Sequence, residues 1–216
     1  MLVTLDVGGT LGHADGPTVT GVLATASPLG ARQARRIMRD ILHTQPEITL
    51  DVIAAVCDAL RVPDHCFPLD LTPSPLTLLP GVADTLRAMN RHASLVTLSN
   101  VTCVEADLAH LRELLSPWVV AHFPSCCIGY AKPNQDAFAA VARSCGVPVS
   151  ETVHIGDDWE CDIIGARNAG ATAIWIAGHR PVPDPGLLTD PKVLVVANIA
   201  QASEYVTNLA TTRRQS

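Results

Sequence analysis

The chain has 216 residues, of which 48% are hydrophobic and 17% charged, and its formal net charge at pH 7 is −6. This composition excludes intrinsic disorder, and the length suits one domain, or one domain with a sizeable insertion. The negative charge argues against a nucleic-acid-binding surface, which needs a basic field. No apolar run approaches the roughly 20 residues that a membrane span requires, and the first residues lack the basic start and long apolar core of a signal peptide.

The seven cysteines do not suggest a metal site or a disulfide framework. They form no C-x-x-C pair, and no histidine stands at the spacing of a zinc finger. Most of them lie among apolar residues, which is typical of reduced, buried thiols in a cytosolic protein. We therefore expect a cytoplasmic location.

The first part of the chain predicts one strand followed by a helical insert. Residues 2–7 form a short apolar run that ends at Gly8-Gly9, as a buried strand followed by a loop would. Residues 30–43 and 50–60 place apolar side chains at helical spacing, and proline-containing breaks separate them. We expect a mostly helical segment over residues 17–76.

After Pro80-Gly81, strands and helices alternate regularly. Helices are expected at 82–89, 104–115, 134–144, 162–169 and 199–209, and strands or short extended pieces at 94–98, 119–123, 126–128, 152–155, 172–177 and 193–196. The strands are apolar throughout instead of alternating, which indicates burial on both faces. The sequence therefore predicts an α/β fold with a parallel sheet covered by helices on both faces.

Polar side chains stand at the ends of these strands, where parallel sheets place their chemistry. Asp6 follows the first strand and Ser99-Asn100 the second, and Lys132 precedes a helix. An acidic group, Asp157, Asp158 and Asp162, follows another strand. A carboxylate can attack phosphorus, a hydroxyl and a lysine can hold the transferred group, and paired carboxylates bind Mg²⁺. Each of these residues alone is common in loops. The evidence for a site is that four chemically complementary groups occur in this order along the chain.

This series resembles the four motifs of the haloacid dehalogenase-like (HAD) hydrolase superfamily. The stretch Asp6-Val7-Gly8-Gly9-Thr10-Leu11 is similar to its first motif, Ser99 to its second, Lys132 to its third, and Gly156-Asp157 with Asp162 to its fourth. The resemblance covers the whole chain. It implies a Rossmann-like core made of residues 1–16 and 77–212, with a small helical cap at residues 17–76, inserted after the first strand.

The resemblance also implies a function: hydrolysis of a small phosphorylated metabolite, a phosphomonoester, through an aspartyl-phosphate on Asp6. Mg²⁺ is the implied cofactor, with Asp6, the Gly8 carbonyl and Asp157 as its ligands. Ser99, Asn100 and Lys132 are expected to bind the substrate, and Thr10 to brace the first loop. Asp162 is expected to orient Lys132 or the waters of the metal. Asp158 is expected to bind the metal or to accept a hydrogen bond just outside its ligands. Neither nucleic acid nor membrane is an expected partner.

One position departs from the pattern. Phosphatases of this family usually carry a second Asp two residues after the nucleophile, where it protonates the leaving oxygen, and here that position is Gly8. General acid–base help is typically worth about 10²–10⁴-fold, so we expect slow turnover unless another group substitutes. His13 and Asp15, in the next loop, are candidates for that substitution, although both suit an ordinary turn.

Three alternatives follow from the missing aspartate. Phosphonate-cleaving relatives need a cap lysine, and this chain has none before Lys132, which excludes that mechanism. Dehalogenases of the family need no metal, and the acidic group at residues 157–162 argues against that activity without excluding it. A catalytically weak or non-enzymatic binding protein of the same fold also stays open.

Two further features concern the substrate pocket. The helix over residues 30–43 carries a stripe of arginines, which we expect to be solvated, with contact to an anionic substrate as the alternative. The stripe comprises Arg32, Arg35, Arg36 and Arg39. Trp159, inside the last motif, either walls the pocket or packs beneath its loop.

Overall fold

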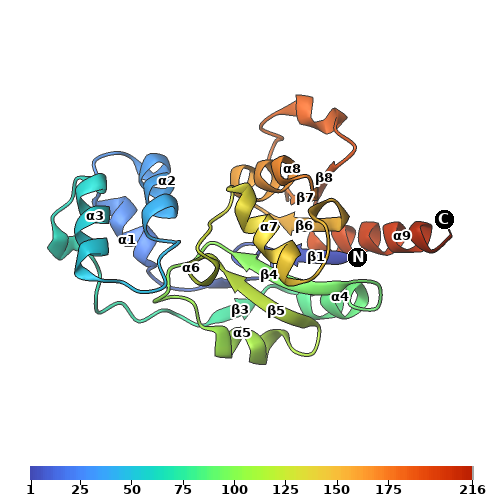
Figure 1. The fold of residues 1–216 in the computed structure, drawn as a ribbon, viewed down its shortest axis with the longest axis horizontal. Helices are drawn as coiled ribbons and strands as arrows, with labels where there is room; N and C mark the ends of the chain where they lie inside the picture. The colour runs from blue at the N-terminus through green and yellow to red at the C-terminus, as the bar shows by residue number, and fades with distance from the viewer. Residues whose placement is uncertain (216) are drawn as a thin grey trace.

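The structure, a computed structural model, describes residues 1–215 and is built on a six-stranded parallel sheet (Figure 1). The strands lie in the order β5-β4-β1-β6-β7-β8. Their bounds are β1 Leu2–Leu5, β4 Ser94–Ser99, β5 Val119–Pro124, β6 Thr152–Gly156, β7 Thr172–Ile176 and β8 Val193–Val196. The chain adds β4 and β5 on one side of β1, and then β6, β7 and β8 on the other side. Strand order therefore reverses at β1, and in such sheets the crevice beyond this point holds the ligand.

Helices cover both faces of the sheet, so the predicted α/β fold is confirmed. One face packs against α4 (Val82–Met89), α5 (Leu108–Leu115) and α9 (Ile199–Gln215), and the other against α6 (Ser125–Ile128), α7 (Gln135–Ser144) and α8 (Gly165–Ala169). Within β1, Val3 and Leu5 belong to the first hydrophobic cluster and Leu2 to the second, as the period of two in a strand requires. Burial on both faces explains why the strand is apolar except for Thr4.

The segment after β1 forms a helical cap that lies to one side of the sheet (Figure 1). It contains α1 (Val19–Ala26), α2 (Ala31–Ile41), α3 (Leu50–Leu60) and the short turn η1 (Asp64–Cys66). These helices pack around a hydrophobic cluster of their own. An antiparallel ribbon of β2 (Gly12–Ala14) and β3 (Leu76–Leu78) joins the two ends of the segment. The exact boundaries, a core of 1–16 and 77–212 and a cap of 17–76, stay a prediction.

Short helical turns complete the described chain, and some elements differ from expectation. The turns are η2 (Val149–Glu151), the π-helical η3 (Trp159–Ile164) and η4 (Pro185–Thr189). Residues 126–128 lie in the short helix α6, which ends at Gly129 with a φ of 77°, so their assignment as an extended piece was wrong. Helix α5 starts later than expected because the Asp107 side chain accepts the His110 N–H as an N-cap. No helix among residues 1–215 combines the length and apolar character needed to cross a membrane.

The cap helices depend on their own buried cluster, and two leucines of α3 test this. Leu60 is 0% exposed in that cluster, whereas Leu50, on the same helix, is 81% exposed. We expect Leu60→Ala to lower the free energy of unfolding by about 2–5 kcal/mol, because it leaves a cavity. Leu50→Ala should change it by less than about 0.5 kcal/mol. Urea denaturation of the three proteins measures both changes, and equal values for the two variants would contradict the packing described.

Candidate active site

The carboxyl ends of three adjacent strands bring the predicted residues together. Asp6 follows β1, Ser99 ends β4 and Asp157 follows β6, and β1 lies between the other two strands. Lys132 comes from the segment before α7, and its side chain reaches Asp6. The fold therefore places these four residues at one edge of the sheet.

The ammonium group of Lys132 bridges two buried carboxylates. Its Nζ donates to Asp6 Oδ1 at 2.7 Å and to Asp162 Oδ1 at 2.6 Å. Only 2% of Lys132 is exposed. Burial by itself would lower the pKa of Lys132, but the charges of Asp162 and Asp6 outweigh it and hold the pKa above its usual value. Lys132 is therefore a permanent cation beside Asp6.

Asp162 is itself held by groups that the sequence analysis did not single out. His154 Nε2 lies 3.1 Å from Asp162 Oδ1, and Thr4 Oγ1 lies 2.7 Å from His154 Nδ1. Burial opposes ionisation of Asp162, but Lys132 and the hydrogen bond from His154 hold its pKa below the usual range. Burial lowers the pKa of His154, which keeps the ring neutral. The sequence did contain a signal for these two residues, because Thr4 and His154 are polar residues within the largely apolar strands β1 and β6.

Asn100 supports Lys132 through the backbone. Its Oδ1 accepts the Lys132 N–H at 2.8 Å, and its Nδ2 donates to the Lys132 carbonyl at 2.7 Å. Both ends of the amide are therefore engaged by one peptide segment. This geometry assigns the side chain of Asn100 to positioning Lys132, and the predicted contact with substrate stays a prediction.

Ser99 and Thr10 flank Asp6 in different environments. Ser99 lines a cavity that opens toward the cap, where its side chain can meet a ligand. Thr10 is 2% exposed, and its buried hydroxyl has no hydrogen-bond partner among the described residues. The predicted bracing of the loop by Thr10 stays a prediction.

Three carboxylates form a cluster suited to a cation. One oxygen from each of Asp6, Asp157 and Asp162 lies within 4.8 Å of the others. Both oxygens of Asp162 are already engaged, because Oδ1 accepts from Lys132 and Oδ2 from the backbone N–H of Asp158. Asp6 and Asp157 are therefore the carboxylates left for a metal.

The charge balance of the cluster supports this fit. Burial raises the pKa of Asp6 to about 7 even though Lys132 opposes the shift. Burial and the nearby Asp162 also raise the pKa of Asp157, and Arg180 Nη1, 3.4 Å away from it, compensates only in part. A divalent cation with oxygen ligands supplies the missing positive charge. The site therefore fits such an ion.

A glycine lets Asp157 approach the Asp6 loop. Gly9 has a φ of 80°, and a Cβ built there would lie 2.7 Å from Asp157 Oδ1. No other residue type combines this left-handed backbone with such a close approach at low cost. Gly9 of the first motif therefore serves the geometry of the acidic cluster.

Asp158 and Trp159, the other residues singled out near the last motif, make contacts within the protein. Asp158 is exposed, and its Oδ1 accepts the N–H of Cys161 as the N-cap of η3. Its predicted contact with the metal stays a prediction, since Asp158 is not among the clustered carboxylates. Trp159 packs edge-on against Trp175 with ring centroids 4.9 Å apart, and it does not line the cavity. Of the two alternatives for Trp159, packing beneath the loop is the observed one.

Two arginines of the cap helix α2 reach the core. Arg39 Nη2 donates to Glu160 Oε1 at 3.0 Å, and its Nη1 contacts Cys161 Sγ at 2.8 Å. Arg32 reaches the other Glu160 oxygen at 3.5 Å. The expectation of a solvated stripe was wrong for Arg39, whose side chain is 14% exposed. Helical spacing shows which residues share a face, but it does not show what that face meets.

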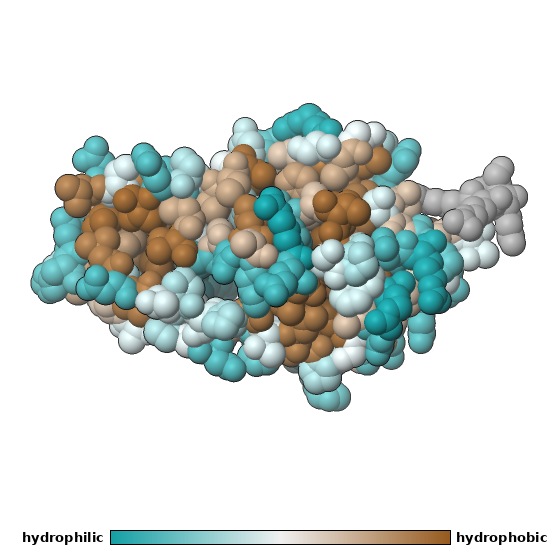
Figure 2. Space-filling model, turned by 90° about the horizontal axis from the view of Figure 1, so that it is seen from below, coloured by the Kyte–Doolittle hydropathy of each residue, from teal (hydrophilic) through white to brown (hydrophobic). Residues whose placement is uncertain are grey.

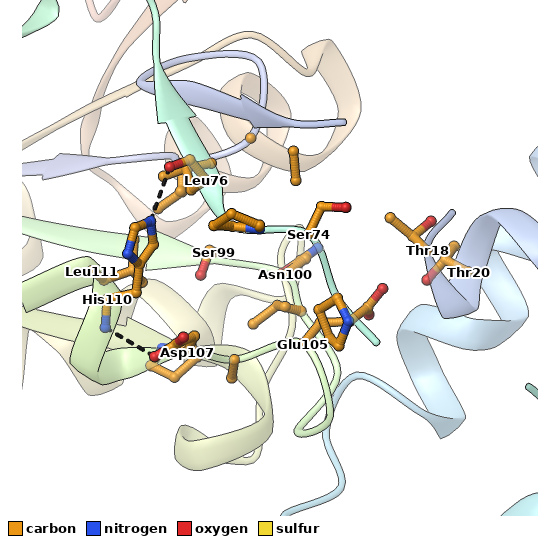
Figure 3. Close-up of a pocket in the computed structure, with 18 of the residues that line it drawn as sticks. Thr18, Thr20, Ser74, Leu76, Ser99, Asn100, Glu105, Asp107, His110 and Leu111 are labelled. Carbon is orange, nitrogen blue, oxygen red and sulfur yellow. Dashed lines mark hydrogen bonds between the residues drawn. The ribbon is translucent and has the colours of Figure 1, made fainter. Parts of the chain in front are cut away.

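A cavity of about 640 Å³ lies between the cap and the core. Val7, Gly8, Ser99 and Asn100 line its inner end, directly beside the Asp6 loop. Figure 3 shows Ser99 and Asn100 between Thr18 and Thr20 of the cap side and His110 of α5. Figure 2 shows an opening between the two parts of the molecule. The cavity provides room for the part of a ligand beyond the group held at Asp6.

The two loop residues considered as substitutes for the missing acid lie outside this cavity. His13 and Asp15 pair with each other at 3.4 Å and are exposed, and neither lines the cavity. Gly8 does line it, and a Cβ built on Gly8 would meet no atom within 4 Å. The position of the usual second aspartate is therefore open space.

Comparison with known proteins identifies the family. The family model described as haloacid dehalogenase-like hydrolase matches residues 1–170. The chain belongs to this family. The resemblance that the four motifs suggested is thereby confirmed at the level of the family.

Two curated relatives are named as a nucleotidase and a phosphatase. The chain is 31% identical over 114 residues to the pyrimidine 5′-nucleotidase YjjG of Escherichia coli, covering 50% of this chain and 49% of that protein. It is 31% identical over 93 residues to the 5-amino-6-(5-phospho-D-ribitylamino)uracil phosphatase YigB of the same organism, covering 43% and 37%. The chain thus spans half or less of the length of these relatives.

A solved structure extends the comparison to the whole fold. The crystal structure of 2-haloacid dehalogenase from Pseudomonas syringae is 22% identical to the chain, with a TM-score of 0.65. The match covers 96% of this chain and 98% of that one. At this identity the comparison shows the shared fold, including the cap, and does not assign an activity.

The chain's two lysines offer a matched test of the buried bridge. Lys132→Met leaves the carboxylates of Asp6 and Asp162 buried without their cation. We expect the free energy of unfolding to fall by about 3–5 kcal/mol. Lys192→Met removes an exposed ammonium that contacts only a backbone carbonyl, and it should cost less than about 1 kcal/mol. Urea denaturation near neutral pH compares them, and equal losses would contradict the role given to Lys132.

Proposed function

We propose that the protein is a Mg²⁺-dependent phosphatase that hydrolyses a small phosphomonoester through a phosphoryl intermediate on Asp6. The observation that carries this proposal is the carboxylate of Asp6, held 2.7 Å from a buried lysine and clustered with Asp157. The next two residues, Val7 and Gly8, line the cavity between cap and core. The nucleotidase and phosphatase names of the two curated relatives support it.

In this proposal, Asp6, Asp157 and the Gly8 carbonyl would hold Mg²⁺, which would supply positive charge to the phosphoryl oxygens and so lower their repulsion of the nucleophile. Lys132 Nζ donates a hydrogen bond to Asp6 Oδ1, which leaves Oδ2 to attack phosphorus. Lys132 opposes the effect of burial on the pKa of Asp6 and so favours the ionised carboxylate. Asp162 holds the ammonium in place through its own hydrogen bond.

The reaction then runs in two steps. The Asp6 oxygen forms a bond to phosphorus, the bond from phosphorus to the leaving oxygen breaks, and that oxygen takes a proton from water. Ser99, which lines the inner end of the cavity, donates to a phosphoryl oxygen. Water next attacks the acyl phosphate, which releases inorganic phosphate and restores the Asp6 carboxylate. Gly8 supplies no acid in the first step, so turnover of alkyl esters is slow.

Two other functions remain as alternatives with different signatures. A 2-haloacid dehalogenase would use Asp6 on carbon and release halide without metal, as the fold of one structural neighbour permits. The cluster of three carboxylates favours the metal-dependent reaction, because Lys132 and Arg180 balance its negative charge only in part. A non-catalytic member of the family would bind a phosphorylated ligand without hydrolysing it.

The nucleophile is tested by Asp6→Asn, which keeps the size of the side chain and removes its charge. We expect hydrolysis of 4-nitrophenyl phosphate with Mg²⁺ to fall by about 10³-fold or more, and to stop in the wild type when EDTA is added. Asp58→Asn, an exposed change on α3, is the matched control and should leave the rate unchanged. Full activity of Asp6→Asn would refute the proposal, and metal-independent halide release from 2-chloropropionate would favour the dehalogenase.

The missing acid is tested by Gly8→Asp, since the space at Gly8 is open. The new carboxyl group should raise kcat for an alkyl phosphate by about tenfold or more, because a poor leaving group needs a proton. The gain should be smaller for 4-nitrophenyl phosphate, whose leaving group departs as an anion. Gly8→Asn, of equal size but unable to donate such a proton, is the control. An equal gain with Asn would show that size, and not acid catalysis, is responsible.

A further inference from the structure

The outer part of the cavity determines what a substrate carries beyond its phosphoryl group. The inner end reaches Gly8 and Ser99, so a phosphoryl group on Asp6 leaves the rest of the molecule in the space between cap and core. The whole cavity measures about 640 Å³, which leaves room in its outer part for a ring or a larger group. Figure 3 shows this region between Thr18 on one side and His110 on the other.

The described lining of this cavity contains acidic residues but no lysine or arginine. Its charged members are Glu105, in the loop after β4, and Asp107, at the start of α5. His43, on the cap side, is uncharged near neutral pH because burial lowers its pKa to about 4. The field inside the outer cavity is therefore negative, although Lys132 sits just beyond its inner end.

The negative charge of Glu105 is fixed in the wall. Its Oε1 accepts the backbone N–H of Val19 at 2.9 Å, and its Oε2 accepts the hydroxyl of Thr102 at 2.6 Å. These bonds tie the first turn of the cap helix α1 to the loop that follows Ser99. The carboxylate cannot turn away from a ligand without breaking them.

The arginines of the cap that could offset this negative charge pair with Glu160 instead. Arg39 and Arg32 of the cap both bind Glu160, outside the cavity lining. The rest of the wall is largely apolar and includes Pro17, Pro73, Pro75, Val101, Ala106 and Leu111. An anionic group in this space would lose water and gain no positive partner.

We infer that the protein selects phosphomonoesters whose leaving group is largely apolar and either neutral or cationic, and that it discriminates against those that carry a second anionic group. This inference rests on the proposed phosphatase function and narrows its substrate class. A sugar bisphosphate or a phosphorylated carboxylic acid is a poor substrate in this assignment. A monophosphate ester of a neutral ring compound or of an amino alcohol is a good one.

Three aryl esters of matched size test the selection. Phenyl phosphate, 4-(aminomethyl)phenyl phosphate and 4-carboxyphenyl phosphate differ mainly in the charge placed in the outer cavity. We expect kcat/KM with Mg²⁺ for the neutral and cationic esters to exceed that of the carboxylate by about tenfold or more, since two carboxylates lie in the wall. Equal rates, or a preference for the carboxylate, would overturn the inference and leave the phosphatase proposal standing.

A binding measurement covers the case in which none of the esters is hydrolysed, which would refute the proposed function. Benzylphosphonate and its 4-carboxy analogue cannot be hydrolysed at carbon–phosphorus by the proposed route, so calorimetric titration in the presence of Mg²⁺ reports selection alone. We expect about tenfold weaker binding of the carboxy analogue. Equal dissociation constants would overturn the inference whatever the catalytic result.

A charge variant links the selection to the cavity wall. Asp107→Asn removes one lining charge and retains an N-cap for α5, because asparagine caps helices as well as aspartate does. The preference for phenyl phosphate over 4-carboxyphenyl phosphate should shrink by about threefold. Asp51→Asn, an exposed change in the first turn of α3 outside the lining, should leave the ratio unchanged. An unchanged ratio in Asp107→Asn would contradict the assignment of the selection to this wall.

Discussion

The ammonium group of Lys132, enclosed between Asp6 and Asp162, is the interaction on which the site depends. Burial of an ammonium or a carboxylate alone costs several kcal/mol, and here each ion is buried only because the other is present. Asn100 fixes the Lys132 backbone, and His154 fixes Asp162. The position of Asp6 is therefore set jointly by the ends of β1, β4 and β6 and by the segment before α7.

The cavity has opposite electrostatic character at its two ends. The inner end offers Lys132 and a carboxylate pair that suits a divalent cation, whereas the outer end presents Glu105 and Asp107 in a largely apolar wall. A phosphomonoester of a neutral alcohol has the complementary distribution, with a dianionic head and an uncharged remainder. In the proposed function, the fold therefore contributes to both the chemistry and the choice of ester.

Periodicity and motif order predicted the parts of the molecule that depend on local sequence. Helix α3 is predicted at both ends, because Thr49 caps its start and its apolar residues recur at helical spacing up to Leu60. The meeting of Asp6, Ser99 and Asp157 follows from parallel strands, whose ends share one edge. Both conclusions need only short-range pattern and the fold class.

Tertiary partners determined the rest, and no local pattern contains them. The spacing of the cap arginines does not reveal that Arg39 meets Glu160, which lies far along the chain. His154 belongs to an apolar strand, and only the folded sheet shows that its ring reaches Asp162. Likewise, α6 forms where Ser125 bonds the backbone of Val101 beside the end of β4.

The contact between Arg39 and Glu160 joins the cap to the loop that carries both Asp157 and Asp162. Separation of the cap from the core has to break this contact and the neighbouring one to Cys161. One ion pair therefore restrains both the cap helix α2 and the segment between two carboxylates of the cluster, although Arg39 and Glu160 are more than a hundred residues apart in the sequence.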